Sequence, residues 1–365
     1  MKGEQDDAPL LAPSPLFAPH PVPRILIVAP SWIGDTLLAQ PLLRRLHDKL
    51  GLVSIDALAP PWCAPLLARM PEIAEVIASP FAHGELKLRA RWRLGRELAQ
   101  RNYDKAIVLP NSFKSALIPF FADIALRTGF VGESRYGLLN VMHKLDENKL
   151  PLMADRYAQL AEKPGDPVAP RLAVPHLAVN EANMLITMAR LGLDRSKPVA
   201  VFCPGAEYGP AKRWPAHHFA DFAKRLAARG ITVWLLGSNK DREVGDDIGA
   251  QSGNAAINLC GRTDLAAAID LMSVARWVVS NDSGLMHVAA ALGRPLVALY
   301  GSSSPEHTPP LAHTDKLVRI TRIDGLECSP CYQRECPLGH FRCLNELSPE
   351  RVLLELDALP PALAA

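Results

Sequence analysis

The chain has 365 residues, of which 48% are hydrophobic and 21% are charged, and its formal net charge is +2. This composition is typical of a soluble globular protein that is long enough for two domains, and so small a net charge argues against a nucleic-acid partner. No apolar run approaches the roughly 18 residues that a membrane-spanning helix requires, so no such helix is predicted.

The first 23 residues are predicted to form a disordered leader. Six prolines interrupt this segment, and proline offers no backbone N–H to a helix or a strand ladder. Acidic residues near its start and the prolines also distinguish it from a signal peptide. We therefore expect the protein to remain in the cytoplasm.

Four short apolar runs in the first half of the chain predict strands that are covered on both faces of a sheet. They are residues 24–29, 53–59, 75–79 and 105–110. A helical pattern over 36–50 repeats leucine every turn, and the segment 111–126 starts with Asn or Ser as a candidate helix cap. This alternation predicts a parallel sheet.

The segment 87–101 is rich in Lys and Arg and contains a single Glu. The simplest interpretation is the solvated face of a helix. The alternative is a surface that faces an acidic ligand or an anionic membrane.

A proline-rich segment at 163–175 predicts a linker, after which the alternation of strands and helices resumes. The predicted strands are 199–205, 231–237, 276–281 and 295–301, and the predicted helices are 215–229, 240–252, 264–274 and 284–292. The sequence therefore predicts two Rossmann-like α/β domains. Their bounds are 24–175 and 176–347, between the leader 1–23 and a C-terminal helix and tail at 348–365.

Parallel sheets bind ligands at the carboxyl ends of their strands, and two facing sheets form a cleft. Asp35 follows the first predicted strand, where an acidic residue either caps the next helix or acts on a ligand.

In the second half, residues 279–295 run from a strand through a polar turn into a helix. Asp282 and Ser283 are candidate caps, and Gly284 permits close approach of a ligand to the backbone. The free N–H groups and the helix dipole there favour an anion such as a diphosphate. His287 lies one turn further on the same face as Ser283, where it could donate to a phosphate. Capping alone would also account for Asp282 and Ser283.

The loop 203–215 follows another predicted strand and holds Glu207, Lys212 and Arg213. Its two cations suit the neutralisation of phosphate charge, although a polar loop of this kind is commonly only solvated. Lys240 and Asp241 follow the next strand and could contact a ribose or a base. The same residues could instead simply start a helix.

The seven cysteines divide into two groups. Three are predicted to be small buried hydrophobic residues, and they are Cys63, Cys203 and Cys260. The other four surround His340 and raise the question of a zinc or iron–sulfur site; they are Cys328, Cys331, Cys336 and Cys343. Their spacing fits no standard zinc finger, and a reducing cytoplasm tolerates free thiols, so we predict no metal.

The chain lacks a G-x-G-x-x-G fingerprint after its first strand, a P-loop, and an Asp-x-Asp pair that would hold a divalent cation. In the absence of a metal, Lys212, Arg213 and the helix terminus at Ser283 would have to stabilise a diphosphate leaving group.

Five motifs together resemble glycosyltransferase family 9, the family of bacterial lipopolysaccharide heptosyltransferases. They are spread over residues 24–357 in the order of the family, and they read PSWIGDTLLAQPLLRRL, PNSFKSALIPFF, CPGAEYGPAKRWP, NDSGLMHVAAALGRPLVALYG and CSPCYQRECPLGHFRCL. The resemblance implies a GT-B fold with the acceptor on the N-terminal domain and the nucleotide sugar on the C-terminal domain. It also implies an inverting, metal-independent transfer without a cofactor.

The resemblance implies ADP-L-glycero-β-D-manno-heptose as donor and, as acceptor, the first heptose of a Kdo-bearing lipid A core. It implies peripheral contact with the cytoplasmic face of the inner membrane. The basic segment 87–101 would face either the Kdo carboxylates and phosphates of the acceptor or that membrane. It implies that Asp35 is the catalytic carboxylate. For the donor it implies Lys212, Asp282, Ser283, Gly284, Leu285 and His287. From their positions after predicted strands we add Glu207, Arg213 and Asp241 as candidate donor residues, and Asn111, Ser112 and Lys114 as candidate acceptor residues.

Two features depart from the resemblance or receive no role from it, namely the proline-rich leader and the cysteine cluster. Four alternatives remain open from the sequence. The chain could be another heptosyltransferase of the same family, a nucleotide-sugar-binding protein, a nucleotide-sugar epimerase or a zinc-organised scaffold.

Overall fold

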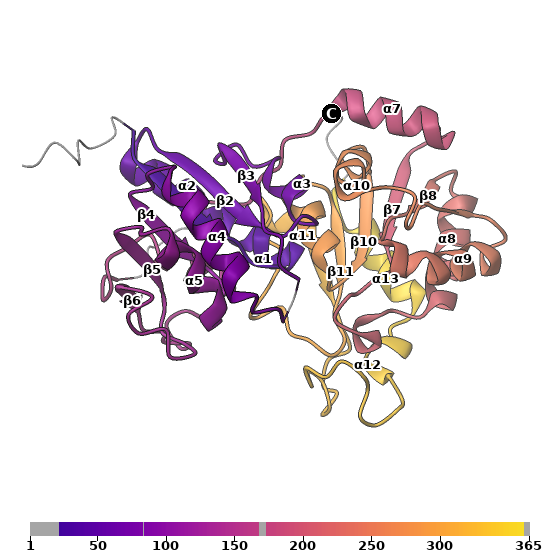
Figure 1. Cartoon of the computed structure of the whole chain (residues 1–365). Helices are drawn as coiled ribbons and strands as arrows, with labels where there is room; N and C mark the ends of the chain where they lie inside the picture. The colour runs from indigo at the N-terminus through magenta and orange to yellow at the C-terminus, as the bar shows by residue number, and fades with distance from the viewer. Residues whose placement is uncertain (1–21, 83, 168–172, 361–365) are drawn as a thin grey trace, which may run out of the picture.

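The computed structural model describes residues 22–82, 84–167 and 173–360, which form two α/β domains side by side (Figure 1). Each domain is built on a six-stranded parallel sheet, with the order β3-β2-β1-β4-β5-β6 in the N-terminal domain and β12-β11-β10-β7-β8-β9 in the C-terminal domain. The prediction of two Rossmann-like parallel sheets is confirmed. Across the described ranges, no helix combines the length and the apolar composition that crossing a bilayer requires. The predicted leader lies outside the described residues except for its last two positions.

All eight predicted strands are present, with ends that differ by one or two residues. They are β1 (Arg24–Val28), β2 (Ser54–Ala59), β3 (Glu75–Ala78), β4 (Lys105–Val108), β7 (Val199–Cys203), β8 (Thr232–Leu235), β10 (Trp277–Asn281) and β11 (Leu296–Leu299). Four further strands were not predicted, namely β5 (Leu126–Phe130), β6 (Val141–His143), β9 (Ala256–Asn258) and β12 (Val318–Thr321). Three of these are edge strands, which lack the continuous apolar run of a central strand.

Helices cover both sheets. The N-terminal domain contains α1 (Ile33–Leu38), α2 (Gln40–Leu50), α3 (Ala64–Leu67), α4 (Leu88–Ala99), α5 (Phe113–Phe121) and α6 (Met153–Gln159). The rest of the chain contains α7 (Glu181–Leu191), η2 (Pro210–Lys212), α8 (Ala216–Ala228), η3 (Asn239–Asp241), α9 (Arg242–Gln251), α10 (Leu265–Met272), α11 (Gly284–Ala291), η4 (Asp315–Leu317), α12 (Arg342–Asn345) and α13 (Pro349–Asp357). The predicted helices at 215–229, 240–252, 264–274 and 284–292 are confirmed.

The prediction of a single helix over 36–50 is wrong, because α1 ends at Leu38 and α2 begins at Gln40. Pro41 lies in the first turn of α2, where its missing N–H costs no helical hydrogen bond. The predicted cap of α5 is also wrong in part, since Ser112 occupies the N-cap position but its side chain makes no capping hydrogen bond.

The two domains share a hydrophobic core. One continuous cluster of buried apolar side chains includes Leu37 and Leu42 from the N-terminal domain and Met286 and Val288 from the C-terminal domain. Burial of apolar area across the interface stabilises one relative placement of the two sheets. Cys63, Cys203 and Cys260 are buried, as predicted.

An ion pair beside the linker reinforces this placement. Arg69 donates from both terminal nitrogens to the carboxylate of Asp270, with both distances 2.7 Å. The Asp270 side chain is fully buried and also accepts from the Asn180 backbone N–H at 2.9 Å and from Asn183 Nδ2 at 2.6 Å. A buried carboxylate with this many donors is well compensated, so the pair fixes the N-terminal domain against α7 and α10.

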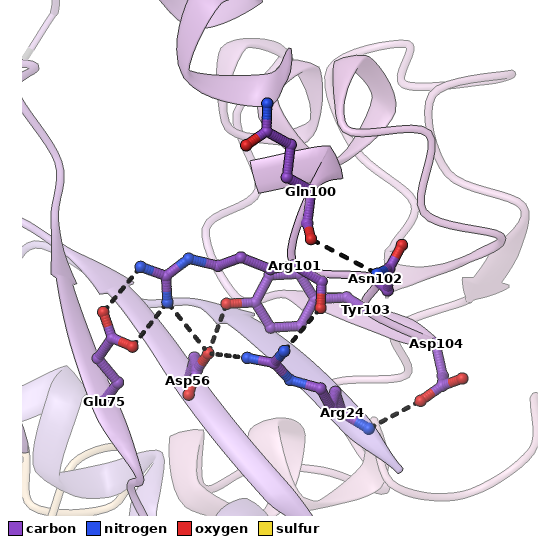
Figure 2. A network of polar contacts seen from close by, with 8 residues as sticks. All are labelled: Arg24, Asp56, Glu75, Gln100, Arg101, Asn102, Tyr103 and Asp104. Atoms are coloured by element: carbon purple, nitrogen blue, oxygen red, sulfur yellow. Dashed lines mark hydrogen bonds and ion pairs between the residues drawn. The ribbon is translucent and has the colours of Figure 1, made fainter. Parts of the chain in front are cut away.

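A second polar network ties together the strands of the N-terminal sheet (Figure 2). The buried carboxylate of Asp56 on β2 accepts from Tyr103 Oη at 2.6 Å and from Arg24 at 3.3 Å. Arg101 lies 3.5 Å from the same carboxylate and forms a bidentate pair with Glu75 at 2.7 and 2.8 Å. Arg101, the last residue of the basic segment 87–101, is therefore a structural residue.

Candidate active site

Most of the residues selected from the sequence follow the four central strands of the two sheets, whereas Lys240 and Asp241 follow β8. In each sheet the order of the strands reverses at one point, which lies between β1 and β4 in the N-terminal sheet and between β7 and β10 in the C-terminal sheet. Such switch points leave a crevice at the carboxyl ends of the strands. Asp35 follows β1, residues 111–114 follow β4, the loop 204–214 follows β7, and residues 282–287 follow β10.

A cavity of about 680 Å³ opens at the carboxyl edge of the N-terminal sheet. Asp35 lies in its wall, together with the three predicted acceptor residues Asn111, Ser112 and Lys114. The rest of the lining mixes apolar and polar side chains, among them Trp32, Leu86, Phe113, Glu133, Arg156 and Tyr157. This N-terminal cavity is large enough for a sugar-sized group and offers both signs of charge.

Asp35 is the third residue of α1, whose N-cap position is Trp32. The alternative that Asp35 is an N-cap is therefore wrong. Burial raises the pKa of this carboxyl group to about 6, and the charges of His307 and Lys212 limit the rise. Its carboxylate is thus a stronger proton acceptor than an exposed aspartate, yet it is still ionised at neutral pH.

Lys212 and Asp282 face each other in the C-terminal domain. Lys212 Nζ lies 2.5 Å from Asp282 Oδ2, and the hydroxyl of Ser303 donates to the same carboxylate. The side chain of Asn281 clamps both ends of the Lys212 loop, accepting from Trp214 N at 3.0 Å and donating to Pro204 O at 2.7 Å. Lys212 is therefore held in position by a loop that is anchored to β10.

Ser283 occupies the N-cap position of α11, but neither its side chain nor that of Asp282 caps the helix. The alternative that both residues serve only as caps is therefore wrong. The first N–H groups of α11 have no partners within the helix, and together with the helix dipole they favour an anion beside Ser283 and Lys212. Leu285 follows in the first turn and packs against the shared core.

The N-termini of α1 and α11 meet across the domain interface (Figure 1). A Cβ atom on Gly34 would lie 2.8 Å from His287 Cδ2, and a Cβ atom on Gly284 would lie 2.7 Å from Ile33 Cβ. Glycine at both positions thus permits the contact, which brings the segment of Asp35 against the segment of His287.

His287 is buried beneath this contact. Burial lowers its pKa to about 4, with Asp282 opposing the shift and Lys212 adding to it, so the imidazole is neutral at pH 7. Its Nδ1 atom has no hydrogen-bond partner among the described residues. Its ring lies against Gly34 of the other domain, a contact that the sequence analysis did not foresee.

We expect Gly34→Ala to loosen the interface between the domains. The added methyl group would force α1 away from His287, and overpacking of this kind costs about 1–3 kcal/mol. Calorimetry should show a lower Tm, and kcat/KM should fall because Asp35 moves with α1. The control is Gly249→Ala on α9, whose new Cβ would have its nearest neighbour at 3.7 Å and which should be neutral or stabilising. An unchanged Tm and kcat/KM for Gly34→Ala would contradict the close contact.

Three other residues selected from the sequence contact neighbouring protein groups. Glu207 is exposed and forms an ion pair with Lys240, and Arg213 donates to Ala206 O at 3.3 Å within its own loop. Asp241 is buried and accepts from Ser238 N at 2.9 Å and Ser238 Oγ at 2.7 Å, which completes a capping box at η3. For Asp241 the structure favours the alternative of a helix start.

The loop that follows β11 was not among the predicted site segments. His307 on this loop contacts the other domain, since its Nδ1 lies 2.8 Å from Pro151 O and its backbone O accepts from Met153 N at 3.0 Å. Its charge acts on Asp35. The position of this loop at the carboxyl end of a strand was the sequence signal that could have identified it as part of the site. Arg156 and Tyr157 of the cavity were also missed, because α6 was not predicted.

The four clustered cysteines line a small cavity of about 20 Å³ with His340, and all four are free thiols. Backbone N–H groups, chiefly that of Phe341, lower the pKa of Cys336, whereas burial and the other three cysteines raise the pKa of Cys343 to about 11. Over the ranges that the structure describes, no three His, Cys, Asp or Glu side chains are arranged to hold a metal ion.

Comparison with known proteins shows which family the chain resembles along most of its length. The model of glycosyltransferase family 9 (heptosyltransferase) matches residues 91–342. Lipopolysaccharide heptosyltransferase 2 of Escherichia coli K12 is 46% identical over 345 residues, covering 92% of this chain and 98% of that protein. Lipooligosaccharide heptosyltransferase 2 of Haemophilus ducreyi is 44% identical, covering 92% and 99%. The solved structure of E. coli ADP-heptose LPS heptosyltransferase II matches with a TM-score of 0.82 and 45% identity, over 92% of this chain and 98% of that chain.

Proposed function

The chain belongs to glycosyltransferase family 9 and has its GT-B fold, and we propose that it moves L-glycero-D-manno-heptose from ADP-L-glycero-β-D-manno-heptose to the first heptose of a Kdo-bearing lipid A core. Lipopolysaccharide heptosyltransferase activity with ADP-heptose, in synthesis of the inner core, is the broader activity on which this assignment rests. The observation that supports it is that Asp35 lines the N-terminal cavity within electrostatic reach of Lys212, which pairs with Asp282.

The proposed chemistry divides between the N-terminal cavity and the Lys212–Asp282 pair of the C-terminal domain. The acceptor hydroxyl would enter the N-terminal cavity beside Asn111, Ser112 and Lys114. Asp35 would take its proton as the oxygen attacks the anomeric carbon of the heptose. The bond from that carbon to the diphosphate breaks in the same displacement, so the configuration inverts and ADP leaves with the electron pair.

The C-terminal wall would stabilise the leaving ADP. Lys212 and the N–H groups at the start of α11 would neutralise the negative charge that develops on the diphosphate. Asp282 and Ser303 hold Lys212 in place before the donor binds. Glu207 and Arg213, on the same loop, remain candidates for contacts with the rest of the donor. Contact between the domains excludes water that would otherwise hydrolyse ADP-heptose.

A pH profile would test the role of Asp35. Its pKa of about 6 predicts that kcat/KM falls about tenfold per pH unit below pH 6, because only the ionised carboxylate accepts a proton. The acid limb should vanish in Asp35→Asn, whose residual activity has no carboxylate to titrate. A flat wild-type profile between pH 5 and 8 would contradict this role.

The substrate assignment is tested by transfer from ADP-heptose to defined acceptors, detected by mass spectrometry. We expect product with an inner core that already carries one heptose and none with an unprimed core. Transfer to the unprimed core would instead identify a different heptosyltransferase of the family. Donor conversion without acceptor would indicate an epimerase, and donor binding without product a binding protein.

We further propose that the enzyme acts as a peripheral protein at the cytoplasmic face of the inner membrane. The proposed acceptor is anchored in a bilayer by its lipid A, whereas the donor is a water-soluble nucleotide sugar. An enzyme that joins the two must present its N-terminal cavity to the membrane surface.

A further inference from the structure

The exposed side of α4 combines apolar and cationic side chains. Buried residues form one stripe of the helix at Arg91, Gly95 and Leu98. The solvent side carries Leu88, Arg89, Trp92, Arg93 and Arg96, which we call the α4 face, and also one acidic residue, Glu97. Leu88 and Trp92 lie one turn apart and are 51% and 55% exposed. Large exposed apolar groups rimmed by charge mark an interaction surface.

The cations of this face are available to a partner. Within the described part of the chain, no Asp or Glu lies within ion-pair distance of Arg89, Arg93 or Arg96. In contrast, Lys87 pairs with Glu85, and Arg101 pairs with Glu75. Unlike those two, the three arginines of the α4 face have no intramolecular ion pair that would explain their presence on the surface.

The α4 face lies beside the mouth of the N-terminal cavity. The buried guanidinium of Arg91 donates to Leu86 O at 2.6 Å, to Glu85 O at 2.9 Å and to Lys114 O at 3.2 Å. It therefore fixes the start of α4 against the start of α5. Leu86 and Phe113 line the cavity and are also 51% and 42% exposed, so the apolar rim of the cavity leads toward Leu88 and Trp92.

We propose that the α4 face docks the enzyme on an anionic phospholipid bilayer, with Trp92 and Leu88 at the level of the headgroups and the three arginines paired with lipid phosphates. This docking proposal rests on the proposed function, because that function has an acceptor that lipid A anchors in a bilayer. A helix that presents Trp and Leu beside several Arg has the composition of an interfacial membrane contact. Docking at this face places the mouth of the N-terminal cavity against the membrane.

The first measurement is partitioning of the full chain onto lipid vesicles by co-sedimentation, without donor or acceptor. We expect binding to vesicles of phosphatidylethanolamine and phosphatidylglycerol, little binding to phosphatidylcholine, and weaker binding as salt increases. The triple variant Arg89→Glu, Arg93→Glu, Arg96→Glu should partition about 100-fold less strongly. The double variant Leu88→Ser, Trp92→Ser should lose about tenfold.

Matched controls make the same changes away from the α4 face. The charge control is the triple variant Arg195→Glu, Lys197→Glu, Lys224→Glu, which changes the net charge by the same amount on the exposed surface of the C-terminal domain. The apolar control is the double variant Ile186→Ser, Leu354→Ser, which removes exposed apolar side chains there. These variants should bind vesicles nearly as the parent does, apart from a small uniform effect of net charge. Equal losses in the control and α4 variants would overturn the proposal.

The second measurement distinguishes the membrane from the acceptor's own anionic groups. For acceptor embedded in anionic vesicles, KM should rise in the α4 variants, whereas for a lipid-free heptose-primed core oligosaccharide it should not. An equal rise with both acceptors would overturn the proposal and assign the arginines to the acceptor sugar. Vesicle binding without any heptose transfer would support the surface and contradict the proposed function, so the two can fail separately.

Discussion

Asp35→Asn should lower kcat by about 10²–10⁴, the usual contribution of a general base. The amide cannot accept the proton of the acceptor hydroxyl, although it fits the same space in the first turn of α1. Donor affinity should be nearly unchanged, because Asp35 lies in the wall of the N-terminal cavity and the donor groups lie on the other domain. Single-turnover kinetics and calorimetric titration with ADP would measure the two quantities separately.

The matched control for this variant is Asp155→Asn on α6. Burial also raises the pKa of Asp155, but this residue does not line the N-terminal cavity. We expect its kcat to stay within a few-fold of the parent. If Asp35→Asn turned over at a near-normal rate, or if both variants lost activity equally, Asp35 would not be the base.

Lys212→Met should weaken the affinity for ADP by about 10- to 100-fold, the effect of losing one charge-assisted hydrogen bond to phosphate. Methionine keeps most of the side-chain stem but removes the cation that sits 2.5 Å from Asp282. The loss should also reduce kcat, because charge that develops on the leaving diphosphate would be less well neutralised. Calorimetry with ADP and steady-state kinetics with ADP-heptose give the two effects.

Removal of Lys212 also leaves the buried carboxylate of Asp282 without its cation, so folding must be checked by Tm. Lys212→Arg retains the charge and should recover part of the affinity. Lys224→Met makes the same substitution at an exposed position of α8 and should leave ADP binding unchanged. An unaltered Kd in a well-folded Lys212→Met protein would remove this residue from the diphosphate site.

Much of the fold could be predicted from the sequence, because central strands of a parallel sheet are apolar on both faces. β1, β4, β7 and β10 are strands of this kind, and each is followed by a loop and a helix. Polar residues directly after such strands must lie at the ligand-binding edge of the sheet. This rule located Asp35, the Lys212 loop and the segment of Asp282 before any contact between them was known.

Other features could not be predicted in this way. The edge strands β6, β9 and β12 have weaker apolar patterns, because their side chains are only partly buried. The engagement of Asp241 in a capping box and the role of the loop that carries His307 depend on contacts that residue spacing does not report.

The sequence by itself determined eight of the strands, the parallel arrangement of the sheets and the chemical type of the residues at the carboxyl ends of those strands, because these depend on local patterns. Only the tertiary structure decided which of those residues meet across the cleft. The pKa of Asp35 depends on burial and on the charges of Lys212 and His307, both from the other domain. These groups come close to Asp35 because Gly34 and Gly284 allow α1 and α11 to contact each other. This packing joins residues about 250 positions apart in the sequence, which no local pattern can report.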